Sequence, residues 1–382
     1  MKTSLQRILT THVGSLPRSK AVTDVVFALE NNQAIDMAEA EKTIRRAVRQ
    51  VVIRQSEAGI DVASDGEMSK ISYATYIKDR ITGFDGDSPR QPPKDLEDFP
   101  GFMKRLADSG GTPTYKKPCC VGEIRTKDLN PLQQDISNFR QAMDLTPVTE
   151  GFMNAASPGV IALFQPNHHY PDHNSYLEAL ANAMQVEYEA ITKAGLILQL
   201  DSPDLGLGRH MMFKDKTEKE YQALANLHVE VLNHATRNIA PEKMRLHVCW
   251  GNYEGPHHCD APMSTVLPIA LKARPQALLF EASNPRHAHE WTVFRDSKIP
   301  TDKILIPGVI DSTTNFVEHP ELVAERICKF ADIVGRERVM AGTDCGFSTF
   351  AGFGAVDEDI VYAKLSAMVE GANLASSKLW PV

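Results

Sequence analysis

Four residues with metal-binding side chains stand where predicted strands end. His247 and Cys249 lie two positions apart in an apolar run, so a strand would direct both side chains to the same face. Glu281 follows the next apolar run, and Cys345 follows the last one. One imidazole, two thiolates and one carboxylate suit a tetrahedral Zn²⁺ ion. The sequence therefore predicts a zinc site formed by His247, Cys249, Glu281 and Cys345.

This set of ligands also indicates a chemistry. A zinc ion held partly by a carboxylate can exchange that ligand for an incoming thiol, which it then holds as the nucleophilic thiolate. The set is therefore typical of alkyl transfer to sulfur. Glu281 and Asp311, which both follow predicted strands, are the candidate catalytic carboxylates.

The other cysteines and the paired histidines show no such convergence. Histidines occur in two loop segments, 167–170 and 256–258, where nothing in the spacing supplies a third ligand. We expect these histidines to be solvated. The cysteines outside the predicted site are expected to lack metal-binding partners, and they are Cys119, Cys120, Cys259 and Cys328.

Eight short apolar runs, each ending in a small or polar residue, alternate with longer amphipathic segments. This alternation predicts an α/β fold of eight strand-helix units, the (β/α)8 TIM barrel. In that fold the C-terminal ends of all strands meet at one mouth, so residues that follow different strands converge there. The predicted strands cover residues 8–13, 60–63, 148–154, 195–200, 245–249, 277–280, 304–310 and 338–341.

Long segments with apolar residues at helical spacing, 37–58, 176–194 and 217–238, are expected to form part of the outer ring. An excursion at about 83–124, between the second and third predicted strands, interrupts the alternation of strands and helices. Its first part is dense in proline, glycine and charged residues. Its last residues, 118–124, are predicted to form an extra strand, and the excursion to form a hairpin or lid over the mouth. We predict one barrel domain over residues 1–382 that carries this insertion.

The charge and hydropathy of the chain exclude several classes of partner. Forty-one basic and 49 acidic side chains give a net charge of -8, so no global field attracts nucleic acid or anionic lipid. No window approaches the roughly 18 consecutive apolar residues of a membrane span, and residues 1–14 lack the apolar region of a signal peptide. We expect a cytoplasmic protein that binds small molecules, with no nucleic-acid or membrane partner, and we leave a homo-oligomer open.

Five segments, in order along nearly the whole chain, resemble the C-terminal catalytic barrel of cobalamin-independent methionine synthase. The resemblance implies zinc as the cofactor and places the zinc ligands at the same four residues that the strand ends predict. The segments are THVGSLPR at 11–18, DGE at 65–67, LHVCW at 246–250, the glutamate at 281 and GTDCG at 342–346.

The resemblance also implies a homocysteine pocket formed by Ser15, Glu67 and Asp201. Two carboxylates would pair with the ammonium group of an amino-acid thiol, whereas a sulfonate thiol would require a cation such as Arg18 or Arg209. We therefore expect homocysteine as the methyl acceptor, with Arg18 as a further candidate substrate-binding residue.

The alkyl donor is left open. The family's histidine that follows the aspartate of the seventh strand, assigned to protonating the leaving folate nitrogen, is absent from Asp311-Ser312-Thr313-Thr314. The chain also looks like single-barrel relatives that use another methyl donor, and like the epoxyalkane:coenzyme M transferases, in which a zinc-bound thiol opens an epoxide. Folate, methylcobalamin and an epoxide all stay candidate donors. Two other classes compete, a metal-free barrel lyase or decarboxylase and a non-catalytic barrel that binds a thiol or metabolite.

Overall fold

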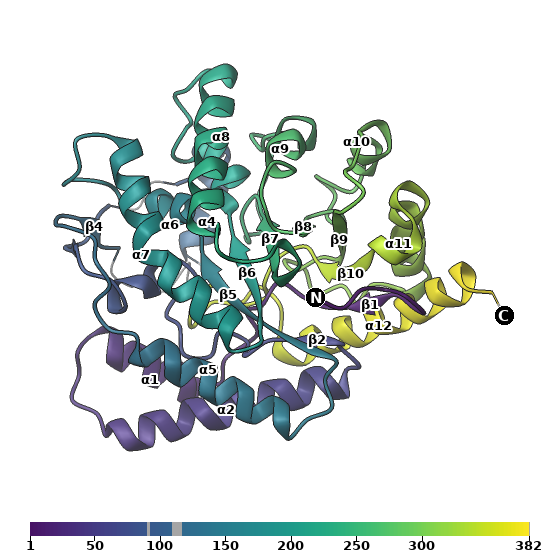
Figure 1. Cartoon of the computed structure of the whole chain (residues 1–382), viewed down its shortest axis with the longest axis horizontal. Coiled ribbons are helices and arrows are strands. Elements are labelled where there is room, and N and C mark those ends of the chain that lie inside the picture. The colour runs from purple at the N-terminus through teal and green to yellow at the C-terminus, as the bar shows by residue number, and fades with distance from the viewer. Residues whose placement is uncertain (90–91, 109–116, 382) are drawn as a thin grey trace.

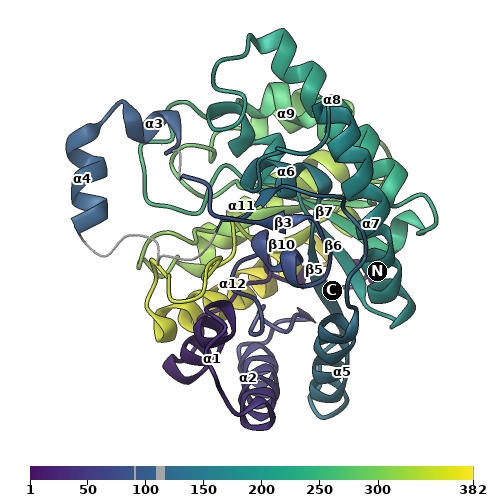
Figure 2. The same cartoon turned by 90° about the vertical axis from the view of Figure 1, so that its left-hand side faces the viewer.

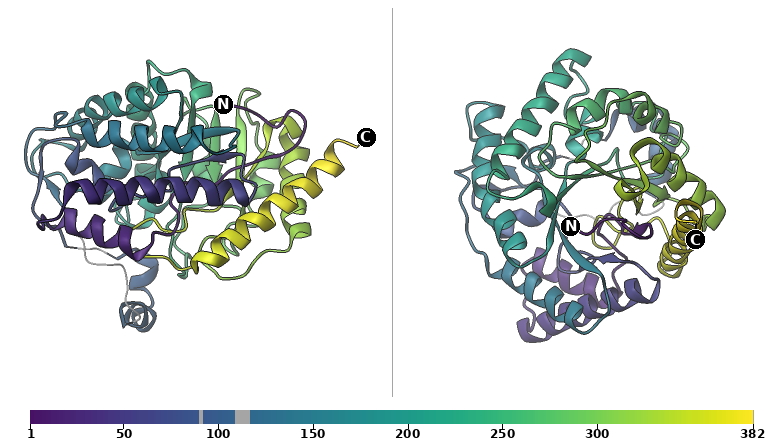
Figure 3. Two further views of the ribbon diagram at one scale, coloured as in Figure 1. Left: turned by 90° about the horizontal axis from the view of Figure 1, so that it is seen from below. Right: turned by 45° about the vertical axis from the view of Figure 1, so that its right-hand side comes forward.

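The computed structural model of the protein describes residues 1–89, 92–108 and 117–381. Among these residues, eight parallel strands form one sheet in the order β1-β10-β9-β8-β7-β6-β5-β2. Its outermost strands are β1 (Leu9–Thr10) and β2 (Val62–Ala63), and the Thr10 carbonyl accepts a hydrogen bond from the Asp61 N–H at 3.2 Å. The sheet thus nearly closes on itself inside a ring of helices, which confirms the predicted (β/α)8 barrel (Figures 1 and 3).

The eight predicted barrel strands are all present; those at 277–280 and 304–310 have the predicted bounds, and the other six have shifted ends. The segment predicted at 8–13 is a strand only at Leu9–Thr10, because further on the Val13 N–H donates to the side-chain hydroxyl of Thr343 on the neighbouring strand at 3.1 Å instead of to a backbone carbonyl. The strand predicted at 338–341 begins two residues later, because Arg336–Arg338 form a 3-10 turn. The remaining strands are β5 (Glu150–Ala156), β6 (Ile197–Asp201), β7 (Met244–Val248), β8 (Ala277–Phe280), β9 (Ile304–Ile310) and β10 (Met340–Thr343).

The three predicted outer helices are present within a few residues of their expected bounds. The helices α2 and α7 are each followed by a glycine two residues beyond their last residue, Gly59 and Gly195, whose φ angles of 84° and 80° lie in the left-handed region that favours glycine. The helices that surround the barrel are α1 (Lys20–Glu30), α2 (Met37–Glu57), α5 (Asn130–Asp144), α6 (Pro158–Phe164), α7 (His173–Lys193), α8 (Glu218–Ala235), α9 (Met263–Ala270), α10 (Trp291–Asp296), α11 (Pro320–Val334) and α12 (Glu358–Leu379). None of the described helices is both long enough and apolar enough to cross a membrane.

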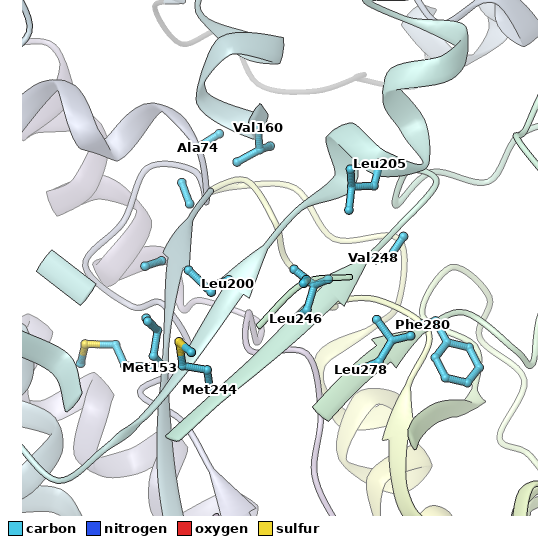
Figure 4. Close-up of a cluster of buried hydrophobic side chains, with 14 of the residues drawn as sticks. Ala74, Met153, Val160, Leu200, Leu205, Met244, Leu246, Val248, Leu278 and Phe280 are labelled. Atoms are coloured by element: carbon cyan, nitrogen blue, oxygen red, sulfur yellow. The ribbon is translucent and has the colours of Figure 1, made fainter. Parts of the chain in front are cut away.

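The alternation of side chains along β7 places the chemistry inside the barrel. Leu246 and Val248 pack into the apolar layer between the sheet and the helices (Figure 4). Because successive side chains of a strand point to opposite faces, Arg245 and His247 are directed into the barrel. Arg245 is fully buried there and donates to the Thr11 hydroxyl at 2.9 Å and to the His12 carbonyl at 2.8 Å.

The insertion between β2 and β5 contains the predicted hairpin, formed by β3 (Phe84–Asp85) and β4 (Cys119–Cys120) as an antiparallel pair. Between them, α3 (Lys94–Glu97) and α4 (Pro100–Asp108) stand out to one side of the barrel (Figure 2). The helix α3 contacts the loop after β7, because the Asp95 carboxylate accepts hydrogen bonds from the Tyr253 hydroxyl at 2.7 Å and the His257 N–H at 3.0 Å. Residues 90–91 and 109–116 of the predicted excursion lie outside the described residues.

Candidate metal centre and acceptor pocket

Three of the four predicted metal ligands meet at the C-terminal mouth of the barrel. His247 lies on β7, Cys249 follows that strand and Cys345 follows β10. One ligand atom from each residue lies within 4.8 Å of the other two, and all three side chains are buried. The two sulfur atoms are 3.3 Å apart, close enough to contact one ion.

The His247 ring has one nitrogen bound and one nitrogen available. Its Nδ1 lies 3.1 Å from Oδ1 of Asp201, whereas its buried Nε2 has no hydrogen-bond partner in the described part of the chain. Asp201 is held in turn by the side-chain amides of Asn154 at 2.9 Å and Gln199 at 2.8 Å. Burial lowers the pKa of His247, but the interactions with Asp201 and Cys249 outweigh it and raise that pKa to about 10. A carboxylate on one ring nitrogen and a free second nitrogen is the arrangement of a metal-binding histidine.

The two thiols lie in surroundings that disfavour thiolates without a compensating cation. The hydrogen bond with Cys345, burial and the charge of Glu281 together hold the pKa of Cys249 well above its ordinary value. A divalent cation would reverse this balance, because a coordinating thiol loses its proton. The imidazole nitrogen and two thiols therefore fit the donor set of Zn²⁺.

The fourth predicted ligand, Glu281, lies close to these three residues but is held by other partners. Its Oε1 accepts a hydrogen bond from the Trp250 N–H at 2.8 Å, and its Oε2 accepts one from the Asn284 side-chain amide at 2.8 Å. Within the described residues, the group whose ligand atoms lie within 4.8 Å of each other does not include Glu281.

Asp344 organises the loop that carries Glu281. Its carboxylate accepts hydrogen bonds from the N–H groups of Ala282 at 2.8 Å, Ser283 at 2.9 Å and Asn284 at 2.8 Å. Burial and the nearby charge of Glu281 raise the pKa of Asp344 to about 7. Asp344 thus fixes the β8 loop relative to β10.

Glu67 combines an unusual backbone with an unsatisfied side chain. Its φ of 59° lies in the left-handed region, which is uncommon for a residue with a side chain, and such strain is concentrated at functional sites. The residue is 1% exposed, and Oε2 has no partner among the residues the structure describes. Burial raises the pKa of Glu67 to about 7, with a contribution from Asp201, while the charges of Lys70 and Arg18 oppose the rise.

Ser15 lies close to the residue after Cys345, which follows β10. A side chain added at Gly346, the residue after Cys345, would place its Cβ 2.0 Å from the Ser15 hydroxyl oxygen. Glycine at 346 therefore allows the turn at Ser15 to approach Cys345 closely.

Arg18 and Asp311 are both occupied by contacts within the protein. The Arg18 guanidinium donates to the Glu67 carbonyl at 2.7 Å and the Ser348 carbonyl at 2.6 Å, which joins the loops after β2 and β10. One Asp311 carboxylate oxygen accepts hydrogen bonds from the N–H and hydroxyl groups of Thr313, and the other accepts them from the N–H and hydroxyl groups of Thr314, at 2.6 to 3.0 Å. The substrate role of Arg18 and the catalytic role of Asp311 stay predictions.

The expectation of solvated histidines in segment 256–258 is wrong for His257. Its Nδ1 lies 3.0 Å from Asp260 and its Nε2 lies 3.0 Å from the Tyr253 carbonyl oxygen. Asp260 also lies 3.0 Å from Nε2 of the buried His287. Burial lowers the pKa of His257, but the hydrogen bond and charge of Asp260 outweigh it and raise that pKa to about 9.

The expectation that His258 and Cys259 lack a third ligand is also wrong. Both lie near Asp98, which follows α3, and the three residues offer ligand atoms within 4.8 Å of one another. The sequence could not show this, because Asp98 belongs to the insertion. His258 and Asp98 are largely accessible to solvent, and Asp98 is paired with Lys94.

The sequence patterns did not predict several other residues of the site. Asn154 and Gln199 lie inside predicted strands, where a polar side chain in a buried parallel sheet is a usable signal. Lys70 and Asn284 lie in loops next to predicted site residues, and no spacing rule distinguishes them.

Comparison with known proteins gives concordant results. The model of the family described as cobalamin-independent synthase, catalytic domain, matches residues 8–374. The methionine synthase of Saccharolobus solfataricus is 26% identical over 376 residues, which cover 97% of this chain and 95% of that protein. The methionine synthase of Sulfolobus acidocaldarius is 25% identical over 372 residues, which cover 97% of this chain and 93% of that protein.

Solved structures show the same fold. A B12-independent methionine synthase from Shewanella sp. W3-18-1, in complex with selenomethionine, superposes with a TM-score of 0.75 at 19% identity over 98% of this chain and 99% of that chain. A putative vitamin-B12 independent methionine synthase from Listeria monocytogenes gives a TM-score of 0.63 at 18% identity, over 98% of this chain and 100% of that chain. The family model spans nearly the whole length of the chain. The chain therefore belongs to the cobalamin-independent methionine synthase family and is a methyltransferase built on that family's catalytic barrel.

Proposed function

We propose that the protein is a zinc-dependent methyltransferase that transfers a methyl or other alkyl group to the thiol of homocysteine. The observation that carries this proposal is the buried convergence of His247, Cys249 and Cys345, with an imidazole nitrogen that no described residue bonds beside two thiols. Zinc, when bound, would supply the charge that keeps an acceptor thiol in its nucleophilic thiolate form at neutral pH.

The protein residues divide into those that hold the ion and those that orient them. His247 Nε2 and the sulfurs of Cys249 and Cys345 would hold zinc, and Asp201 orients the His247 ring through Nδ1. We assign Glu281 as the exchangeable fourth ligand.

The present partners of Glu281 support that assignment. The Trp250 N–H and the Asn284 amide would hold its carboxylate when an acceptor thiol takes its place. This arrangement avoids leaving a displaced carboxylate buried without hydrogen bonds, which would be costly.

The acceptor pocket supports an amino-acid thiol. Glu67 offers a buried carboxylate oxygen that has no partner among the described residues, and its charge interacts with that of Asp201. An ammonium group would relieve this concentration of negative charge. Ser15, next to Cys345, would line the same pocket.

A sulfonate acceptor such as coenzyme M has less support. The guanidinium of Arg18 is committed to two backbone carbonyls, and Arg209 donates to the Phe213 carbonyl at 3.1 Å. Either cation would have to break such bonds to bind a sulfonate.

A thiol-consumption experiment tests the function. Zinc-loaded protein is incubated with homocysteine or coenzyme M, in each case against methyl-folate, methylcobalamin and small epoxides, and loss of free thiol is followed. We expect consumption of homocysteine with a methyl donor, and no consumption after zinc removal. Consumption of coenzyme M with an epoxide would contradict homocysteine as the acceptor and would assign coenzyme M in its place. Failure of every pair would revive the metal-free lyase and the non-catalytic binding barrel.

A further inference from the structure

Asn154, near the end of β5, has an amide whose orientation is fixed by its neighbours. The residue is 2% exposed, and its Nδ2 donates to the Val13 carbonyl at 2.9 Å and to Oδ2 of Asp201 at 2.9 Å. A carbonyl oxygen and a hydrogen-bonded carboxylate oxygen both act as acceptors here, so the nitrogen must face them. The Oδ1 atom must therefore point the other way.

That oxygen is buried and has no hydrogen-bond partner in the described ranges. It lies beside Gly14, where an added Cβ would be 2.2 Å from it. Buried polar atoms are normally paired, because an unpaired one keeps the full cost of its lost hydration. An unpaired acceptor at a strand end therefore indicates a ligand that donates a hydrogen bond.

The surroundings of Asn154 identify the kind of donor. Its backbone carbonyl accepts a hydrogen bond from Lys70 Nζ at 2.8 Å, and Lys70 is bonded through its N–H to the Glu67 carbonyl at 3.1 Å. Asn154 thus lies between the Glu67 loop and Asp201. Glu67 contributes a second unpaired buried oxygen, and Oδ2 of Asp201 accepts only the Asn154 amide among the described residues.

We propose that Asn154 is a specificity residue for the acceptor, whose Oδ1 accepts one N–H of the substrate ammonium group. Glu67 Oε2 and Asp201 Oδ2 accept the other two, so three donors meet three acceptors. A thiol without an amine leaves the Asn154 oxygen unpaired, and Asn154 thereby disfavours it. This inference rests on the proposed use of an amino-acid thiol and adds a neutral residue to the predicted pocket.

The test compares homocysteine with 4-mercaptobutyrate, which is the same molecule without its amine. Isothermal titration calorimetry on zinc-loaded protein gives the dissociation constant of each thiol. In Asn154→Ala we expect the constant for homocysteine to rise about tenfold, as for loss of one hydrogen bond to a charged group. The constant for 4-mercaptobutyrate should change less than about threefold, because that thiol does not use Oδ1.

Gln199→Ala is the matched control. The Gln199 amide also donates to Asp201 and to the Val13 carbonyl, but its oxygen already accepts a hydrogen bond from Arg245 at 2.8 Å. This variant loses a similar support of Asp201 without losing an unpaired acceptor, so its selective loss of homocysteine affinity should be smaller than that of Asn154→Ala. A selective loss in Asn154→Ala no larger than that in Gln199→Ala would reduce Asn154 to a support of Asp201 and overturn the proposal, and so would an equal loss for both thiols.

The wild-type protein supplies a measurement that needs no variant, in case Asn154→Ala does not fold. Homocysteine should bind more tightly than 4-mercaptobutyrate, and equal affinities would overturn the inference. If the wild type binds neither thiol, the proposed function itself fails. Binding of both thiols, weakened together in Asn154→Ala, refutes only the role of Asn154.

Discussion

Two carboxylates at the mouth of the barrel, Glu67 and Asp311, look alike in the sequence and differ in the structure. Both follow a strand of the barrel. In the part of the chain that the structure describes, Glu67 keeps one buried oxygen unpaired on a strained backbone, whereas Asp311 has both oxygens bonded to its own loop. The strand-end position therefore does not identify a ligand-binding group. What distinguishes the two carboxylates is whether the protein already satisfies them.

The same distinction separates the metal side of the mouth from the loop after β9. His247 Nε2, Glu67 Oε2 and Asn154 Oδ1 are buried and unpaired within the described residues, and they come from β7, the β2 loop and β5. The Asp311 loop is closed by its own hydrogen bonds. Experiments that remove an unpaired group should change binding, and those that remove a satisfied group should change stability.

The largest effect is expected from the double substitution Cys249→Ser, Cys345→Ser. It removes both sulfur ligands, so tightly bound zinc should fall from about one ion per chain to a small fraction. Elemental analysis after dialysis measures this. Cys259→Ser, which alters the exposed group near Asp98, is the matched control and should keep its zinc. Zinc retained in the double variant but lost from Cys259→Ser would place the metal in that exposed group.

Replacing Glu67 with glutamine keeps its shape and removes its charge. We expect the dissociation constant for homocysteine to rise by about 10- to 100-fold, because a charged hydrogen bond to the ammonium is lost, with much less change for a thiol that lacks the amine. Calorimetric titration provides both constants. Equal loss for both thiols would mean that Glu67 orients the loop backbone instead of the acceptor.

The raised pKa of Glu67 makes acceptor binding depend on pH. Above about 7 the carboxyl is ionised and can pair with the ammonium, and as the pH falls through 7 it becomes protonated and the attraction is lost. The preference for homocysteine over 4-mercaptobutyrate should therefore fall about tenfold between pH 8 and pH 6. The ratio of the two constants cancels effects at the metal ligands. In Glu67→Gln this ratio should not vary with pH, and a wild-type dependence that persists in the variant would assign the titration to another group.

The smallest effect on binding is expected from Asp311→Asn. This change weakens hydrogen bonds within the loop after β9, so the melting temperature should fall by a few degrees, as expected for a loss of about 1–2 kcal/mol. Zinc content and homocysteine affinity should be unchanged. Loss of methyl transfer with intact binding would instead establish Asp311 as a catalytic residue, and loss of zinc would contradict the comparison.

Much of the barrel can be predicted from the sequence, because period-2 and helical apolar patterns are local properties. The later start of the last strand, at Met340, cannot be predicted from the sequence. Only hydrogen bonding distinguishes a 3-10 turn at Arg336–Arg338 from the start of a strand. The hairpin of the insertion was predicted, whereas the contact of Asp95 with Tyr253 joins segments far apart in the sequence.

The candidate site is predictable to the same extent. The spacing of His247 and Cys249 in a strand implies a shared face, and the fold brings Cys345 to the same mouth. The engagement of Glu281 by Trp250 and Asn284 depends on loop geometry, which residue types do not specify. An unpaired atom such as Asn154 Oδ1 is visible only once every neighbour is in place.

The central claim is that zinc at this mouth accepts a thiol in exchange for Glu281. X-ray absorption at the zinc edge tests it most directly, because it counts the sulfur atoms around the ion. We predict two sulfurs in the zinc-loaded protein, from Cys249 and Cys345, and three when homocysteine saturates it. An unchanged count of two under saturating homocysteine and under saturating coenzyme M would contradict a metal-activated acceptor and leave zinc with a purely structural role.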